Sequence, residues 1–336
     1  MPLLKTIYRP FIIFVFAGLC LRCASQVSNI NTESDKITLI SKISMPGIRG
    51  RIDHIAYDPI NHLVYIAALG NNTIEVVNIN TMKVVNSITG LNEPQGILYI
   101  PSSHTLVVAN GGNGNCAFFD AVSYKQTGTV SLKNDADNIR YDTSSHFIYV
   151  GYGRGSIAVI DPISKRQVAD IRLDDHPESF QISSKHNRLY INVPEAGQIE
   201  VADLSTNKIT AKWKNNNASS NFPMALDEDN NRLFVAYRNP ATLRMINSET
   251  GLDIYSASCS GDADDVFYKD SLVFVSTGIG YIDVFRTTQT SLTQVNHIKT
   301  SKGARTSLLL AAEREILLAV PARGNQPAAL WVYRIN

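Results

Sequence analysis

A unit of about 42 residues occurs seven times in the sequence, and this repeat restricts the possible folds more than any other feature. The first copy, residues 53–88, holds four short apolar runs separated by turn residues, which predicts one four-stranded antiparallel sheet. A period of 40–45 residues with four strands per unit is typical of a β-propeller. Matching positions of successive copies lie 41 to 44 residues apart, at Tyr57, Tyr99, Tyr141, Ile182, Leu226, Tyr268 and Leu310.

The last copy is one strand short, because the sequence ends just after its third run, residues 330–333. Residues 36–43 precede the first copy and have the pattern of a fourth run. Pairing these two segments closes the ring and leaves no open sheet edge, whereas an open solenoid, the alternative, leaves both terminal edges exposed. The sequence therefore predicts an all-β fold, a seven-bladed β-propeller that forms one domain over residues 36–336.

Residues 1–25 have the pattern of a signal peptide. Lys5 and Arg9 precede an apolar stretch at residues 11–21, which is too short to span a bilayer comfortably. Small residues before Gln26 predict cleavage after Ser25, and hence a periplasmic or secreted protein without a transmembrane helix in its mature chain. Lipid attachment at Cys20 or Cys23 is the alternative, although the preceding residues fit it poorly.

The charge of the mature chain is close to neutral. The full sequence has 31 Lys and Arg against 30 Asp and Glu, and cleavage removes Lys5, Arg9 and Arg22, which leaves 28 basic residues. No basic stripe stands out, so nucleic acid is not an expected partner.

One face of the predicted ring carries more polar and charged side chains than the other. The loops that lead into each innermost strand and the loops between second and third strands emerge on the same face, around the central channel. Polar side chains that converge on such a mouth are the default candidates for ligand binding. The candidate ligand-binding residues are Arg51, Asp53, His54, Gln95, Asp137, Asn138, Arg154, His176, Glu178, Asn221, Arg238, Asp264, Asp265, Arg305 and Arg323.

Two interpretations of these residues stay open. Side chains before an inner strand can also hydrogen-bond the backbone of a neighbouring blade and so tie blades together. The mixture of acids, histidines and arginines exceeds what turn capping requires, which favours a ligand. The sequence has no metal-binding motif such as HExxH or an EF-hand, so we expect no metal and no cofactor.

Several segments resemble the repeat of YncE-like bacterial propellers, the YVTN-repeat group. They include Ile148-Tyr149-Val150-Gly151 and Leu189-Tyr190-Ile191-Asn192, and phrases such as His176-Pro177-Glu178-Ser179 resemble those of exported members. The resemblance covers about residues 36–336 and implies an exported seven-bladed propeller, without an activity. Some relatives bind single-stranded DNA, whereas the charge of this chain disfavours nucleic acid.

Two functions from different classes follow. The first is an exported, non-catalytic binding or interaction protein, monomeric, that holds a small molecule or another exported macromolecule at the channel mouth. The second is a propeller lactonase, lyase or hydrolase that acts on a sugar-like or carboxylated metabolite. In that case His54 or His176 would be the general base, and Arg51 or Arg305 would hold an anion.

Overall fold

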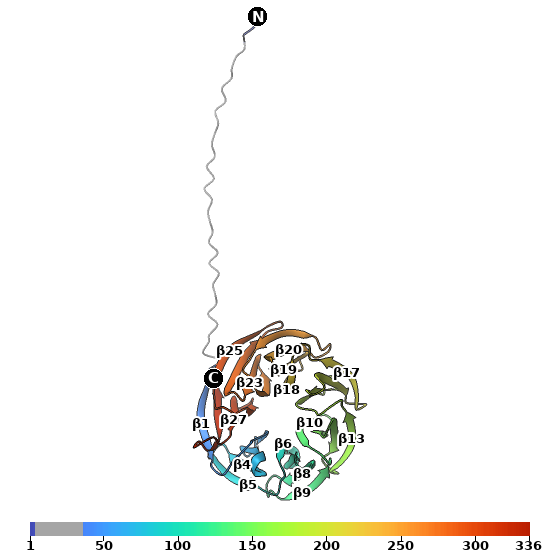
Figure 1. Ribbon diagram of the computed structural model, residues 1–336, viewed down its shortest axis with the longest axis vertical. Coiled ribbons are helices and arrows are strands. Elements are labelled where there is room, and N and C mark those ends of the chain that lie inside the picture. The colour runs from blue at the N-terminus through green and yellow to red at the C-terminus, as the bar shows by residue number, and fades with distance from the viewer. Residues whose placement is uncertain (4–35) are drawn as a thin grey trace. The chain divides into compact units, whose positions relative to one another are not determined.

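The computed structural model describes residues 1–3 and 36–336, so most of the expected signal peptide lies outside the described residues. Within 36–336, seven four-stranded antiparallel sheets surround a central channel (Figure 1). Blade 1 is β2 (Ile55–Asp58), β3 (Leu63–Ala68), β4 (Thr73–Asn78) and β5 (Lys83–Ile88); blade 2 is β6 (Pro94–Ile100), β7 (Thr105–Asn110), β8 (Asn115–Asp120) and β9 (Gln126–Ser131); blade 3 is β10 (Ala136–Tyr141), β11 (Ile148–Tyr152), β12 (Ser156–Asp161) and β13 (Arg166–Arg172).

The remaining blades continue in chain order, and two 3₁₀ turns, Leu69–Asn71 and Pro101–Ser103, connect strands in blades 1 and 2. Blade 4 is β14 (Phe180–Ser183), β15 (Arg188–Val193), β16 (Gln198–Asp203) and β17 (Lys208–Lys214); blade 5 is β18 (Ser219–Asp227), β19 (Arg232–Asn239), β20 (Ala241–Asn247) and β21 (Asp253–Ser258); blade 6 is β22 (Ala263–Lys269), β23 (Leu272–Thr277), β24 (Tyr281–Thr287) and β25 (Leu292–Lys299); blade 7 is β26 (Thr306–Leu310), β27 (Glu315–Val320), β28 (Ala328–Ile335) and β1 (Ile37–Met45).

Blade 7 joins the two ends of the described ring, as the sequence predicts. Strand β1 pairs antiparallel with β28, from Ile37 opposite Ile335 to Met45 opposite Ala328. Figure 1 shows β1 on the outside of the ring, as the outermost strand of this blade. The prediction of a seven-bladed propeller closed by the N-terminal strand is confirmed.

The burial of each strand follows its place in the blade. The two middle strands are buried on both faces, and β15 and β16 of blade 4 show this almost throughout their lengths. The outermost strand, β17, alternates strictly between exposed and half-buried residues, which is the pattern of a strand with one face in water. Neighbouring blades share their cores: Tyr65 of blade 1 packs in one cluster with Leu106 of blade 2.

The turns on the face opposite the mouth are built alike in five blades. An Asp or Asn at the end of the third strand accepts a hydrogen bond from a backbone N–H two or three residues later, as Asn78 Oδ1 does from Asn80 N at 3.0 Å. This is the Asx turn, which satisfies backbone donors that would otherwise lack a partner. The other acceptors are Asp120, Asp161, Asp203 and Asn247.

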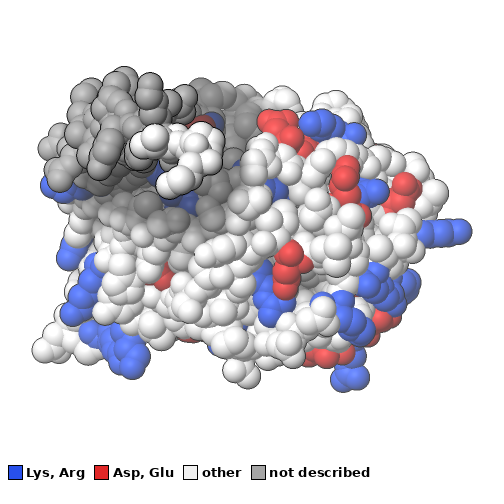
Figure 2. Space-filling view, turned by 90° about the horizontal axis from the view of Figure 1, so that it is seen from above, with Lys and Arg blue, Asp and Glu red and all other residues white. Residues whose placement is uncertain are grey.

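The described residues contain no helix with the length and hydropathy that a bilayer crossing needs. Figure 2 shows one side of the molecule, where basic side chains lie among acidic ones and form no continuous stripe on the part free of grey atoms.

Candidate ligand-binding site at the channel mouth

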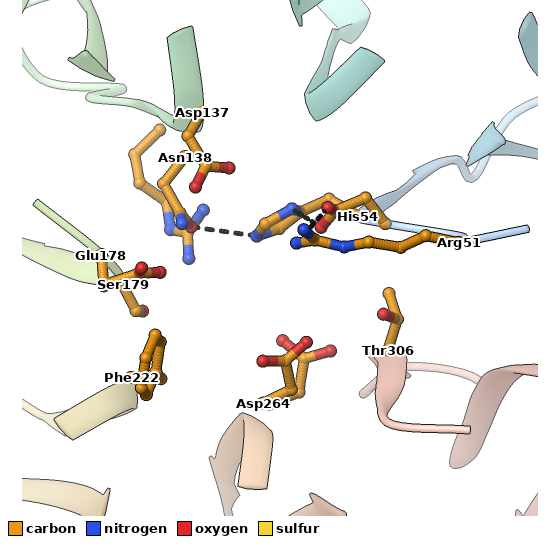
Figure 3. Close-up of a pocket in the computed structure, with 12 residues that line it drawn as sticks. Arg51, His54, Asp137, Asn138, Glu178, Ser179, Phe222, Asp264 and Thr306 are labelled. Atoms are coloured by element: carbon orange, nitrogen blue, oxygen red, sulfur yellow. Dashed lines mark hydrogen bonds and ion pairs between the residues drawn. The ribbon is translucent and has the colours of Figure 1, made fainter. Parts of the chain in front are cut away.

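Three cavities that share lining residues follow one another along the central channel. We call the opening the mouth; it is a cavity of about 460 Å³. Below it is a collar of about 30 Å³, where side chains from blades 1 and 3 to 7 converge (Figure 3). Beyond the collar, all seven innermost strands line a chamber of about 560 Å³. The collar is lined by Arg51, Asp53, His54, Asp137, Asn138, Arg140, Glu178, Ser179, Phe222, Asp264, Asp265 and Thr306.

A local irregularity at the start of the inner strands aims these side chains inward. The pairing of β10 with β11 shifts register between Ala136 and Ile139, and the shift leaves Asp137 and Asn138 outside the regular ladder. In blade 1, Asp53 N and His54 O both hydrogen-bond Ala67, so two residues oppose one. Bulges of this kind bend a strand and redirect its side chains. Blades 2, 4, 5 and 6 have related irregularities at Gln95, Glu178, Phe222 and Asp264.

His54 is the centre of a charged cluster that crosses the channel. Its Nδ1 lies 2.8 Å from Asp53 Oδ1, and its Nε2 lies 3.0 Å from Asn138 Oδ1 of blade 3. Arg51 contacts the other oxygen of Asp53 at 2.7 Å. Burial favours neutral His54, but the contact with Asp53 and its charge outweigh this and raise the pKa of His54 to about 10. His54 is therefore a cation at neutral pH, in conflict with the predicted role of general base.

A second set of ion pairs links blades 5, 6 and 7 around the mouth. Arg238 Nη2 lies 2.6 Å from Asp264 Oδ1, and Arg305 Nε lies 3.1 Å from Asp264 Oδ2. Both arginines also contact Asp262 Oδ1, at 3.4 Å and 2.8 Å. The guanidinium of Arg238 in addition covers the ring of Phe222, with its central carbon 3.9 Å from the ring centroid. These arginines are already neutralised by carboxylates of the protein.

Two carboxylates of the collar differ from the others because they have no partner. Among the described residues, neither Asp137 nor Glu178 makes a side-chain hydrogen bond or an ion pair, and Asp137 Oδ1 is fully buried. Burial raises the pKa of Asp137 to about 6, with a further contribution from the charge of Asp53. Burial and the charge of Asp137 raise the pKa of Glu178 to about 9. Figure 3 shows both groups facing the open centre of the collar.

Asp265 and Arg140 lie where the collar meets the chamber and line both cavities. Asp265 Oδ2 accepts a hydrogen bond from Ser307 N of blade 7 at 2.6 Å, and burial raises the pKa of this carboxyl to about 7. Arg140 donates to the carbonyl of Ile139 at 2.8 Å, and its burial lowers its pKa. Most of the other chamber residues are apolar, so a charged ring separates a polar mouth from a largely apolar interior.

Of the fifteen candidate residues, twelve line the mouth or the collar and three do not. Arg154 and Arg323 are exposed on second-to-third-strand loops and line neither cavity. Asn221 is fully buried and donates to Asn192 Oδ1 and Gln198 O of blade 4. Asn221 thus hydrogen-bonds a neighbouring blade, which is the alternative role that the sequence analysis left open for these residues. The residues brought together are Arg51, Asp53, His54, Gln95, Asp137, Asn138, His176, Glu178, Arg238, Asp264, Asp265 and Arg305.

Five lining residues were absent from the candidate set. Phe222 and Thr306 stand four positions before the repeat's matching residue, the same position as Asp137, so the repeat itself contained that signal. Arg140 is a charge between Ile139 and Tyr141 in the regular part of the inner strand, which is a second usable signal. Nothing comparable marks the other two, Ser179 and Asp135. Asp135 accepts from Gln95 Nε2 at 3.1 Å and lies 3.9 Å from His176 Nδ1.

The collar contains ligand types that metals accept, but not in a suitable arrangement. Within residues 1–3 and 36–336, no three His, Cys, Asp or Glu side chains are placed to share a metal ion. The mouth therefore offers an electrostatic site of carboxylates and arginines rather than a coordination shell.

Comparison with known proteins identifies the fold and nothing finer. The sequence matches no family model, and no curated protein matches it either. In structure, a chain of the mitotic checkpoint complex is similar over 96% of this chain and 98% of its own, with a TM-score of 0.75 and 14% identity. The WD40 repeats of RRP9 are similar over 90% of this chain and 100% of their own, with a TM-score of 0.75 and 10% identity.

A chain of hydrazine synthase from Kuenenia stuttgartiensis is similar over 81% of this chain and 94% of its own, with a TM-score of 0.71 and 14% identity. At such low identities these likenesses establish the propeller fold alone. They include a chain of a synthase and a chain of a checkpoint complex, so the function has to be argued from the site.

Proposed function

We propose that this protein is an exported, non-catalytic binding protein that holds its ligand at the mouth and collar of the propeller. The observation that carries the proposal is the buried, unpartnered carboxylate of Asp137 at a point where six of the seven blades converge. A buried polar group without a partner is costly to keep, and such groups are rare except where a ligand or a function accounts for them. The ligand is a small molecule or a slender part of another exported macromolecule.

Export and family membership belong to the same proposal. Residues 1–25 support export through their signal-peptide pattern, and the repeat phrases support a YncE-like, YVTN-type propeller. Fractionation of cells that express the full-length gene tests the first point: we expect the processed protein outside the cytoplasm. Retention of the unprocessed chain in the cytoplasm would contradict it.

The binding role is tested by a thermal-shift screen of a broad metabolite library, since a ligand that binds the folded state raises its stability by mass action. Every hit is then repeated on the double variant Asp137→Ala with Glu178→Ala. We expect hits that disappear in the variant while its own Tm stays near that of the wild type. A variant that unfolds far more easily would assign these side chains to holding the ring together instead.

One observation favours the enzymatic alternative, a lactonase, lyase or hydrolase. Asp137 and Asp265 have pKa values raised to about 6 and about 7, in the range that suits general acid–base catalysis near neutral pH. The acid–base group would then be one of these carboxyls rather than His54. Turnover of lactones by the purified protein, measured with and without a chelator, and its loss in Asp137→Asn, would decide for this alternative.

A further inference from the structure

The charge balance of the collar indicates which chemical class of ligand it accepts. Arg51 is paired with Asp53, and Arg238 and Arg305 share Asp262 and Asp264. An anionic ligand would have to displace one of these carboxylates before it could use any of these three arginines, and Arg140, deeper in the collar, donates to the carbonyl of Ile139.

The groups of the site that lack a partner are carboxyls instead, and Glu178, with its pKa raised to about 9, ionises when a cation binds beside it. Asp137 is only 7% exposed, its Oδ1 is buried without a hydrogen bond, and Glu178 has no side-chain partner among the described residues. Both carboxyls face the same gap, with Phe222 next to Glu178 and Asp264 on the far side (Figure 3). A cation placed in this gap would supply donors to groups that have none.

The size of the gap limits the kind of cation. The collar offers about 30 Å³, room for one or two groups the size of a water molecule, whereas the mouth above it offers about 460 Å³. An ammonium group is compact and presents three donors, while a guanidinium is planar and larger. A small coordinated metal is disfavoured because no suitable set of ligands exists among the described residues.

We propose that the collar binds the terminal ammonium group of a small organic amine between Asp137 and Glu178, while the rest of that molecule occupies the mouth. This inference rests on the proposed binding function and names its ligand class. Both residues line the mouth as well as the collar; Glu178 is the more exposed of the two, so the amine meets it first, and the more deeply buried Asp137 completes the site.

The test compares three probes of similar length on the purified protein at pH 7.5: 1,4-diaminobutane, the uncharged 1,4-butanediol and the dianion succinate. Calorimetric titration and Tm are measured for each. We expect the diamine alone to bind and to raise Tm. Glu178→Gln and Asp137→Asn should each weaken diamine binding at least tenfold, and the double variant should abolish it. Asp229→Asn, at a side chain 92% exposed away from the mouth, is the control and should bind the diamine normally.

The amide substitutions keep the shape of both side chains and remove no partner, so the variants should fold, which circular dichroism and Tm verify. Binding of the diol or of succinate as tight as that of the diamine would overturn the proposal, and so would diamine binding that survives the double variant. Two further probes are agmatine, which has one guanidinium end, and Ca²⁺. If either of them binds through Asp137 and Glu178 and the diamine does not, the ammonium assignment is wrong.

The outcomes separate this inference from the proposed function. Suppose that a neutral or anionic compound from the library binds in a way that depends on Asp137 and Glu178, and that the diamine does not bind. The inference that the ligand is an amine is then wrong, while the proposed binding function stands. If no compound of any class depends on these two residues, the binding role itself fails, and the amine inference fails with it.

Discussion

We expect the folded protein to lose stability as the pH rises from 7 to 8.5, and Glu178 to account for about half of the loss. Folding raises the pKa of Glu178 from 4.5 to about 9 and that of His54 from 6.5 to about 10. Across this pH range the folded chain keeps two protons at these residues that the unfolded chain releases, and Asp265, with its pKa raised to about 7, adds a smaller loss of the same sign near pH 7. Stability gained from a raised folded-state pKa is complete below the unfolded pKa and is lost as the pH climbs toward the folded one.

The magnitude follows from the number of protons. Each retained proton lowers the free energy of unfolding by about 1.4 kcal/mol per pH unit, so two protons over one and a half units give an upper limit of about 4 kcal/mol. Glu178 and His54 are both half-buried, and solvent screening reduces both shares, so we expect a drop of about 2 kcal/mol, about half of it from Glu178. The range stops at pH 8.5 because Cys116 and Cys259, whose pKa values burial raises to about 12, add losses of the same sign above it.

The assay is urea unfolding followed by the fluorescence of Trp213 and Trp331 at several pH values in this range. Glu178→Gln removes one of the two linked protons, so its free energy of unfolding should fall about half as steeply as that of the wild type. Glu313→Gln, at a carboxylate outside the mouth and collar, should leave the slope unchanged. A flat or rising stability between pH 7 and 8.5, or an unchanged slope in Glu178→Gln, would refute the reasoning.

Three further predictions concern the ring and its ligand. Gly96→Ala should destabilise the fold by about 1–3 kcal/mol, because its Cβ would lie 2.1 Å from the carbonyl oxygen of Asp137, whereas Gly47→Ala, with nothing within 4 Å, should be neutral in the same denaturation assay. Deleting residues 36–43 should lower the unfolding free energy by at least about 3 kcal/mol, since it opens the edge of β28 and removes the buried Ile43, and an unchanged Tm would contradict the closure. Binding of a diamine at pH 7.5 should release about one proton as Glu178 ionises, which titrations in buffers of different ionisation enthalpy would detect as a buffer-dependent heat; a buffer-independent heat would argue that Glu178 is already charged.

The repeat determines the blades because each copy alternates turn residues with apolar runs of strand length, and these local signals need no knowledge of the rest of the chain. The position four residues before the matching residue also marks the mouth correctly, since Asp53, Gln95, Asp137, Glu178, Phe222, Asp264 and Thr306 all line the mouth or the collar.

The function of each neighbouring side chain could not be predicted in the same way. Bulges shift the side-chain alternation by one residue, so Asn221 turns into the protein while Phe222 faces the channel. The protonation state of His54 could not be predicted from the sequence either. It depends on the 2.8 Å contact between His54 and Asp53 and on burial that only the closed ring produces.

The pairing of β1 with β28 has a consequence for how the chain reaches its folded state. Thr38 and Asn336, which are in contact at this seam, are 298 residues apart. Joining two points so distant in an unfolded chain costs roughly 5 kcal/mol in loop entropy. If the blades assemble in succession, each new blade carries the growing arc further around, and the last strand arrives beside the first with most of that loop already ordered. The pairing of β1 with β28 then forms last in folding. Its loss should therefore speed unfolding more than it slows folding.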